Sequence, residues 1–340
     1  MTRRSSAAFA AVALMAVATP ALAAEEVNVY TSRQPALIDP LLKAFTDKTG
    51  IKVNTVFDGK SIEERLKAEG ANSPADLVLT VDVGRLTDLV AKDLVQPVQS
   101  ETLTKNIPAS FRAEDGKWWA LTSRARVFYV SKDRVKDGEI KSYADLADPK
   151  WKGRICTRPG DHDYNVALTA AVLAHEGPEK TKDWLKGVKA NLAQKPQGSD
   201  RSQVKSVKEG LCDVAVGNTY YMAAMLADPE QKAWAEAVNI VFPDQAGNGT
   251  HLNVSGMALT KSAPHKDAAV KLMEFLSSDE AQHIYADLNN EYPVKPGVEW
   301  SKLVKSWGTF KADTLALAKV GELRPAALKL INEVDFNAGP

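Results

Sequence analysis

Two adjacent tyrosines, Tyr220 and Tyr221, are the side chains in this sequence that are best placed to do chemistry. They lie between the apolar run 214–216 and a helix-like run that begins near Tyr221. A strand-to-helix junction directs backbone N–H groups and the positive end of the helix dipole into a cleft, which favours an ionised phenol. An ionised phenol is a hard anionic ligand for a metal ion. The alternative is that the two rings only pack beneath a helix, as paired aromatic residues usually do.

Three other segments would converge on this pair if the chain forms two α/β lobes. Segment 31–34 follows the first predicted strand, segment 158–165 follows a strand that ends at Cys156, and segment 123–126 lies where the chain crosses between lobes. Ligands of open α/β sheets bind beyond the carboxyl ends of the strands. The sequence therefore predicts one ligand site in the cleft between the lobes, to which the second segment contributes Tyr164.

The hydrophobic pattern predicts strands that alternate with helices. We expect extended segments at 27–31, 51–57, 76–81, 118–121, 124–130, 153–156, 211–217 and 253–260. We expect the longer helices at 37–49, 61–70, 165–175, 180–194, 203–209, 267–276, 279–288 and within 312–336. This rhythm indicates an α/β protein in which each lobe has a mixed, mostly parallel sheet flanked by helices.

Two local signals refine the first helices. Pro40 predicts that its helix either begins late, with Asp39 as the cap, or is kinked. The run from Ser61 to Glu64 has the pattern of a capping box, which would open the next helix.

The length of 340 residues is too great for one small core and favours two lobes. We expect residues 24–124 and about 255–297 to form the N-terminal lobe. Residues 125–254 and about 298–340 would form the C-terminal lobe.

The first 23 residues have the pattern of a signal peptide. Two arginines precede an apolar stretch at 7–19, and Ala21-Leu22-Ala23 matches a cleavage signature. The stretch is short for a membrane anchor and ends at Pro20. We therefore expect an exported, soluble protein of a bacterial periplasm. Its 43 basic and 43 acidic side chains argue against a nucleic-acid-binding protein, which would carry a basic excess.

The sequence contains two cysteines, Cys156 and Cys212. In an oxidising compartment a pair of cysteines is more often bridged than free, so we expect a disulfide between them. The alternative is two small buried side chains that do not meet.

Four segments together resemble a known family. They are Val-Asn-Val-Tyr-Thr-Ser-Arg-Gln-Pro at 27–35, Asn-Ser-Pro-Ala-Asp-Leu-Val-Leu-Thr-Val-Asp at 72–82, Trp-Lys-Gly-Arg-Ile-Cys at 151–156 and Gly-Asn-Thr-Tyr-Tyr at 217–221. They resemble the periplasmic ferric-iron-binding proteins of ABC importers, also called bacterial transferrins, over essentially the whole mature chain. The chain is similar to the subgroup whose first loop lacks a histidine ligand, because Gln34 stands at that position.

The resemblance implies the type II fold of two-lobed periplasmic solute-binding proteins, with the ligand in the interlobe cleft. It implies that Tyr164, Tyr220 and Tyr221 bind Fe³⁺ through phenolate oxygens. It also implies a monomer that is not an enzyme and that delivers iron to an inner-membrane ABC permease and its ATPase.

The resemblance further implies a synergistic anion, carbonate or bicarbonate, held by Arg33, Gln34 and Arg124. Fe³⁺ prefers hard oxygen donors, and three phenolates cancel its charge. Carbonate then makes the site negative, which the arginines would offset, although lone arginines near a cleft are also common surface ion-pair partners. One coordination position remains, which a water molecule, a lobe-closing group or His162 would fill.

Two other functions compete with this one. An enzyme would need a nucleophile–base spacing or a Gly-rich phosphate loop, and neither stands out in the sequence. A binding protein of the same architecture for an organic acid, an oxyanion, a phosphate ester or a polyamine is the second alternative, since fold does not decide function. The colour of the protein after addition of Fe³⁺ and bicarbonate discriminates between iron binding and these alternatives, because a tyrosine–Fe³⁺ complex absorbs visible light.

Overall fold

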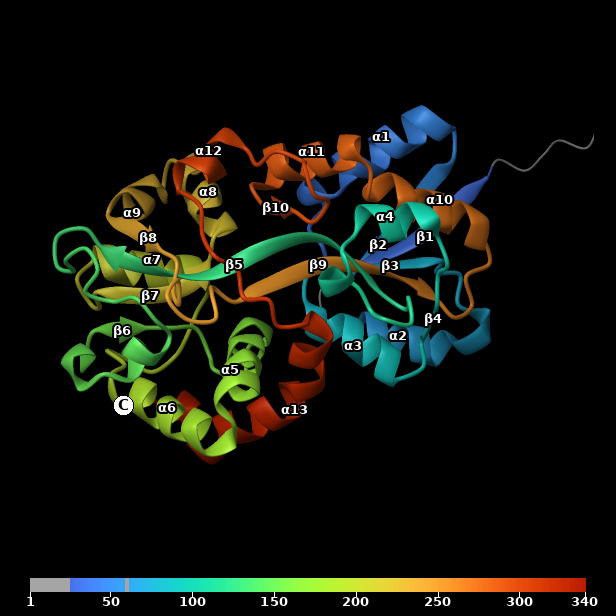
Figure 1. The fold of residues 1–340 in the computed structure, drawn as a ribbon. Helices are drawn as coiled ribbons and strands as arrows, with labels where there is room; N and C mark the ends of the chain where they lie inside the picture. The colour runs from blue at the N-terminus through green and yellow to red at the C-terminus, as the bar shows by residue number, and fades with distance from the viewer. Residues whose placement is uncertain (1–24, 59–60) are drawn as a thin grey trace, which may run out of the picture.

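Figure 1 shows two lobes with β-sheet running through both and helices on either side. The computed structural model describes residues 25–58 and 61–340. The predicted signal peptide, residues 1–23, lies outside these described residues. Within them, no helix combines the length and the apolar character that crossing a membrane would require.

Three parallel strands begin the sheet of the first lobe, β1 (Glu26–Thr31), β2 (Lys52–Phe57) and β3 (Leu77–Thr80). Burial in β1 alternates from Glu26 to Val29, as its sequence predicts, and the last two residues of the strand are both buried. The other elements of this lobe are α1 (Asp39–Thr49), α2 (Ile62–Glu69), α3 (Val83–Ala91), β4 (Val95–Gln96), α4 (Glu101–Asn106), α10 (Lys266–Leu276) and α11 (Asp279–Asn289).

Two long antiparallel strands, β5 (Trp119–Ser131) and β9 (Leu252–Thr260), connect the lobes. Every residue of both strands is buried. Strand β5 pairs with β9 up to Ala125 and with β7 (Val214–Asn218) from Arg126 onward. This change of partner supports a lobe boundary near residues 124 and 125, and the boundaries themselves stay a prediction.

The prediction of two separate extended segments at 118–121 and 124–130 is wrong, because β5 is one continuous strand. A register shift between Ala120 and Thr122 lets the hydrogen-bonded ladder continue past this point. The polar residues that interrupt the apolar pattern are buried and bonded inside the protein. Thr122, for example, hydrogen-bonds Ser255 at 3.1 Å.

The second lobe adds β6 (Ile155–Cys156), which is parallel to β7, and β8 (Val238–Val241), which is antiparallel to β5. The sheets are therefore mixed, as predicted, but the expectation that they are mostly parallel is wrong, because the crossing strands β5 and β9 pair antiparallel with all their neighbours. Parallel pairing joins β1 to β2, β1 to β3 and β6 to β7, and the crossing strands pair antiparallel. Helices lie on both sides of this lobe's strands (Figure 1), namely α5 (Asp163–Glu176), α6 (Pro178–Ala190), α7 (Asp200–Lys208), α8 (Tyr220–Ala227), α9 (Lys232–Glu236) and α12 (Lys302–Ser306).

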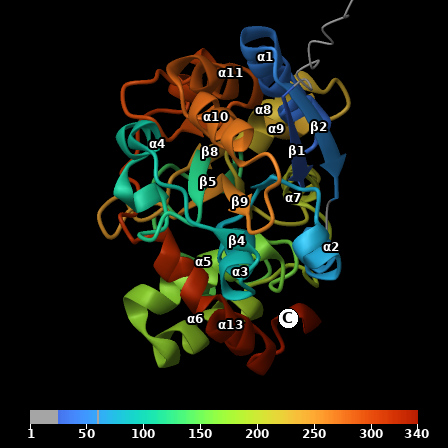
Figure 2. The ribbon, with the colours of Figure 1, turned by 90° about the vertical axis from the view of Figure 1, so that its right-hand side faces the viewer.

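The C-terminal helix contacts both lobes. The chain returns through β10 (Tyr292–Pro293), which pairs with β5, and ends in α13 (Leu317–Glu333). Helix α13 packs against α3 of the first lobe and α5 of the second (Figure 2). The helices approach closely at Gly321, where an added Cβ would lie 2.2 Å from Thr87. The assignment of residues 298–340 to the C-terminal lobe alone therefore stays a prediction.

The starts of α1 and α2 differ in detail from the sequence signals. A 3₁₀ turn at Pro35–Leu37 precedes α1, so the late start is confirmed, but Ile38 rather than Asp39 is the N-cap. Helix α2 starts as expected without a side-chain cap, so the predicted capping box is wrong. The Ser61 hydroxyl instead donates to Asp58 Oδ2 at 2.8 Å.

The predicted disulfide is present. Cys156 at the end of β6 is bridged to Cys212, which precedes β7, and their Cα atoms are 5.9 Å apart. The bridge joins two neighbouring parallel strands and closes a loop with a sequence separation of 56.

Replacing both cysteines, Cys156→Ser with Cys212→Ser, should lower the free energy of unfolding by about 2–4 kcal/mol, because the open loop gains conformational entropy when the chain unfolds. Urea unfolding followed by circular dichroism measures the difference. Wild-type protein in a reducing buffer is the matched control and should lose a similar amount. An unchanged free energy, or free thiols in the unfolded, non-reduced protein, would contradict the prediction.

Candidate metal centre

Helix α8 begins where strand β7 ends, so Tyr220 and Tyr221 follow directly from a sheet strand. Thr219 between the two elements is bonded to β5 in both directions. Its N–H donates to the Ala125 carbonyl at 3.1 Å, and its Oγ1 accepts from the Ala125 N–H at 3.3 Å. The predicted strand-to-helix junction is confirmed, and the crossing strand holds it in place.

Tyr164 reaches the same region from the first turn of α5. Its hydroxyl lies 3.3 Å from the hydroxyl of Tyr220, and the ring centroids of Tyr220 and Tyr221 are 4.2 Å apart. The three phenols line a cleft of about 410 Å³. The other predicted site residues line the same cleft: Arg33, Gln34 and Arg124. The structure thus brings residues from both lobes and from the crossing strand to one place.

Burial raises the pKa of Tyr220 well above that of a free phenol, and a negative charge on Tyr164 or Tyr221 would raise it further. Burial likewise raises the pKa of Tyr221, again with a contribution from Tyr164. The expectation that the N–H groups and the helix dipole of the junction make these phenols easier to ionise is therefore wrong for the ligand-free protein, because desolvation is the largest influence on both pKa values. Both phenols are neutral at neutral pH until a cation arrives, and a trivalent cation would stabilise the phenolates.

Arg33 and Arg124 are both buried and share one hydroxyl. Arg33 donates from Nη1 to Ser255 Oγ and pairs through Nη2 with Glu291, and Arg124 donates to Ser255 Oγ at 3.1 Å. The Thr122 hydroxyl donates to Glu291 Oε2 at 2.9 Å. Arg124 has no ion pair with any described residue. The cluster therefore holds two cations and one carboxylate.

A second arginine pair surrounds the ring of Tyr164. Arg126 forms a buried ion pair with Asp200 at 2.6 Å, and Arg158 contacts the other oxygen of that carboxylate at 3.3 Å. The guanidinium carbons of Arg126 and Arg158 lie 5.8 and 5.1 Å from the centroid of the Tyr164 ring. Arg126 is not among the described residues that line the cleft, so it acts on the site through its neighbours.

His162 contacts Tyr164 and does not line the cleft. Its Nδ1 accepts from the Tyr164 N–H at 3.2 Å at the start of α5, and the two rings meet edge to face with centroids 4.7 Å apart. Burial, followed by the charge of Arg158, lowers the pKa of His162 to about 4, so the imidazole is neutral. His162 does not line the cleft of the described structure, so this geometry does not favour it as a ligand.

Sequence reasoning missed several residues that line the cleft, namely Arg201 and the segment 289–291. Arg201 belongs to α7 and donates to Gln231 at 3.3 Å. Segment 289–291 ends α11, and Asn290 there has a left-handed φ of 52°. Two successive asparagines predict a helix end. No local pattern shows that this helix end returns to the cleft.

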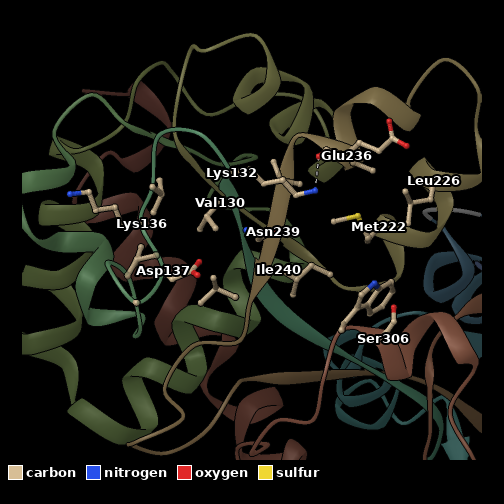
Figure 3. A pocket seen from close by; sticks show the side chains of 17 residues that line it. Val130, Lys132, Lys136, Asp137, Met222, Leu226, Glu236, Asn239, Ile240 and Ser306 are labelled. Atoms are coloured by element: carbon tan, nitrogen blue, oxygen red, sulfur yellow. Dashed lines mark hydrogen bonds between the residues drawn. The ribbon is translucent and has the colours of Figure 1, made fainter.

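A second hollow, of about 450 Å³, lies against the other side of α8 (Figure 3). Met222 and Leu226 of α8 line it together with Lys132 and Ile240, and the Lys132 ammonium donates to the Glu236 carbonyl at 2.7 Å. None of the predicted site residues lines this hollow. Helix α8 therefore presents its tyrosines to the cleft and its larger apolar side chains to the hollow.

The described ranges contain no group of three or more His, Cys, Asp or Glu side chains arranged to hold a metal ion. A metal in the cleft would therefore depend on the phenol oxygens. Phenolate oxygens suit a hard cation and not a soft one.

Residues 72–311 match a family described as bacterial extracellular solute-binding protein. Among relatives, iron uptake protein A1 of Synechocystis sp. is 47% identical over 316 residues, which cover 92% of this chain and 88% of that protein.

Solved structures share the fold. Ferric iron-binding protein A of Mannheimia haemolytica, in an open conformation, is 54% identical with a TM-score of 0.89, and the match covers 92% of this chain and 99% of that chain. A Trichodesmium protein in complex with iron and citrate is 40% identical with a TM-score of 0.89, and the match covers 92% and 99% of the two chains. These likenesses confirm the predicted two-lobed fold. The chain belongs to the bacterial extracellular solute-binding protein family.

Proposed function

We propose that this protein binds ferric iron in the bacterial periplasm through the phenolate oxygens of Tyr164, Tyr220 and Tyr221, together with a synergistic anion. The observation that carries the proposal is the convergence of three phenols in one cleft, with the hydroxyls of Tyr164 and Tyr220 3.3 Å apart. Relatives named for iron uptake and ferric iron binding support it.

The donor set suits the charge of the ion. Three phenolates carry three negative charges and would form a neutral unit with Fe³⁺. Two hydroxyl oxygens 3.3 Å apart can serve as neighbouring ligands of one small cation. Hard oxygen donors also select Fe³⁺ over softer metals.

We propose that Arg33, Gln34 and Arg124 hold the anion, which would be carbonate or bicarbonate. Arg124 carries the argument, because a buried guanidinium that forms no ion pair with a described residue is costly unless an anion joins it. A carboxylate is the alternative, since the Trichodesmium relative was solved with iron and citrate.

The proposed role is binding and release without catalysis. We propose that residues 1–23 direct export, that the mature protein acts as a monomer, and that it passes iron to an inner-membrane ABC permease and its ATPase. Membership of a solute-binding family supports this role.

Tyr220→Phe and Tyr221→Phe should each weaken Fe³⁺ binding by more than about 100-fold, because loss of a ligand should cost more than loss of an outer-shell partner. The visible charge-transfer band, titrated with iron in bicarbonate, measures the affinity. Tyr30→Phe is the matched control, since Tyr30 bonds Glu69 away from the cleft. Unchanged affinity in both cleft variants would refute the assignment.

Iron binding at neutral pH should release at least about two protons per ion, because the raised pKa values keep Tyr220 and Tyr221 protonated beforehand. Protonated phenols compete with the metal, so the apparent affinity should increase with pH between about pH 6 and 8. Titration with ferric nitrilotriacetate in a pH-stat measures the release, with the Tyr220→Phe/Tyr221→Phe protein as the control. A pH-independent affinity argues against phenolate ligands.

Arg124→Ala should lower the iron affinity mainly by loosening the anion, and excess bicarbonate should partly restore it. The same band, recorded at increasing bicarbonate, measures both effects. Arg65→Ala, which removes a partly exposed ion pair on α2, should behave as wild type. If bicarbonate does not affect the wild-type protein, the anion assignment is wrong.

A further inference from the structure

Glu291 is the acidic side chain that faces the predicted anion site. It lines the cleft and is the one acidic residue among the described residues that do so. Its Oε2 accepts from Arg33 Nη2 and from the Thr122 hydroxyl, and the residue is only 4% exposed. A buried carboxylate thus stands in the wall where an anion would enter.

The backbone holds this carboxylate in position. Strand β10 begins at the next residue, and Tyr292 pairs with Ser123 of β5. On the other side, Asn290 caps α11 and its Oδ1 accepts from the Ser301 hydroxyl at 2.8 Å. The backbone of Glu291 is therefore fixed between a helix end and a strand, and its side chain is held by Arg33 and Thr122.

The two predicted anion-binding arginines therefore differ in charge balance. Arg33 is neutralised by Glu291. Arg124 forms no ion pair with a described residue; it donates to the Ser255 hydroxyl at 3.1 Å, and its guanidinium carbon lies 5.7 Å from the centroid of the Tyr164 ring. Both guanidiniums bond the same Ser255 oxygen, so an anion there contacts one group of two cations and one carboxylate. The net charge of this group is a single positive charge, and Arg201 adds a further cation to the cleft lining.

We propose that Glu291 determines which anion accompanies the iron. Its carboxylate cancels one of the three arginines that line the cleft, Arg33, Arg124 and Arg201, and so favours a small anion of low charge, such as bicarbonate, over polycarboxylates such as citrate. The repulsion between Glu291 and a bound anion increases with the charge of the anion. The inference rests on the proposed function, in which Fe³⁺ and three phenolates form a neutral unit. The anion then meets only the charges of the surrounding side chains.

A purely structural ion pair would behave differently. Loss of such a pair changes the stability of the protein but favours no anion over another. The ratio of citrate affinity to bicarbonate affinity therefore separates the two roles.

The test compares wild type with Glu291→Gln, which keeps the shape of the side chain and removes its charge. Isothermal titration calorimetry of the iron-free protein, at one ionic strength, measures binding of sodium citrate and of sodium bicarbonate. The variant should bind citrate at least about tenfold more tightly than wild type, with a smaller gain for bicarbonate, because a like charge beside the anion is gone. Glu299→Gln is the matched control, since Glu299 is an exposed partner of Lys305, and should equal wild type.

If the ratio of citrate affinity to bicarbonate affinity is equal in wild type and Glu291→Gln, the proposal is overturned. Absence of citrate binding by the variant overturns it as well. If Glu291→Gln does not fold, Gln34→Glu provides the opposite change at an exposed position of the same cleft. That variant should lose citrate affinity about tenfold, and more than it loses bicarbonate affinity. An unchanged ratio again counts against the proposal.

The failure of this inference can be told from failure of the proposed function. The charge-transfer band of wild type with Fe³⁺ and bicarbonate is recorded separately. Absence of the band contradicts iron binding. A band together with an unaltered anion preference in the variants contradicts only the role of Glu291.

Discussion

Strand β5 combines complete burial with charged side chains, and the site depends on how those charges are compensated. Strand alternation places Thr122, Arg124 and Arg126 on one side of the strand. A buried guanidinium is costly unless an acid or an anion pairs with it. Asp200 pairs with Arg126 at 2.6 Å, whereas Arg124 forms no ion pair with a described residue and contacts a hydroxyl and the Tyr164 ring. Arg124 lies at the point where β5 changes its partner strand, and it lines the cleft there.

All three segments that connect the lobes contribute side chains to the group that surrounds the buried arginines. Strand β5 supplies Thr122 and Arg124, β9 supplies Ser255, and the residue before β10 supplies Glu291. The hydroxyls link the guanidiniums to the carboxylate, so these side chains form one hydrogen-bonded group. The connections between lobes are therefore part of the proposed anion site as well as of the fold.

The sequence was informative wherever function follows from local order. Strands end at segments 31–34 and 218–221, and the carboxyl ends of strands meet at a cleft, so Arg33 and the tyrosine pair could be found. Glu291 could not, because its contact with Arg33 joins positions 258 residues apart. The continuity of β5 was missed for a related reason. Its polar residues interrupt the apolar pattern of the strand, and the partners that they bond lie far away in the sequence.

The three proposed iron ligands share one lobe. Tyr164 begins α5 and the tyrosine pair begins α8, so the phenols can meet an ion without help from the first lobe. Arg33 and Gln34 come from the first lobe, and Arg124 from the strand that joins the two. Iron affinity should therefore depend on the second lobe, and retention of the anion on both lobes. Under the proposed function, a site divided in this way would take up iron in an open cleft, and the anion would then link the iron to the first lobe.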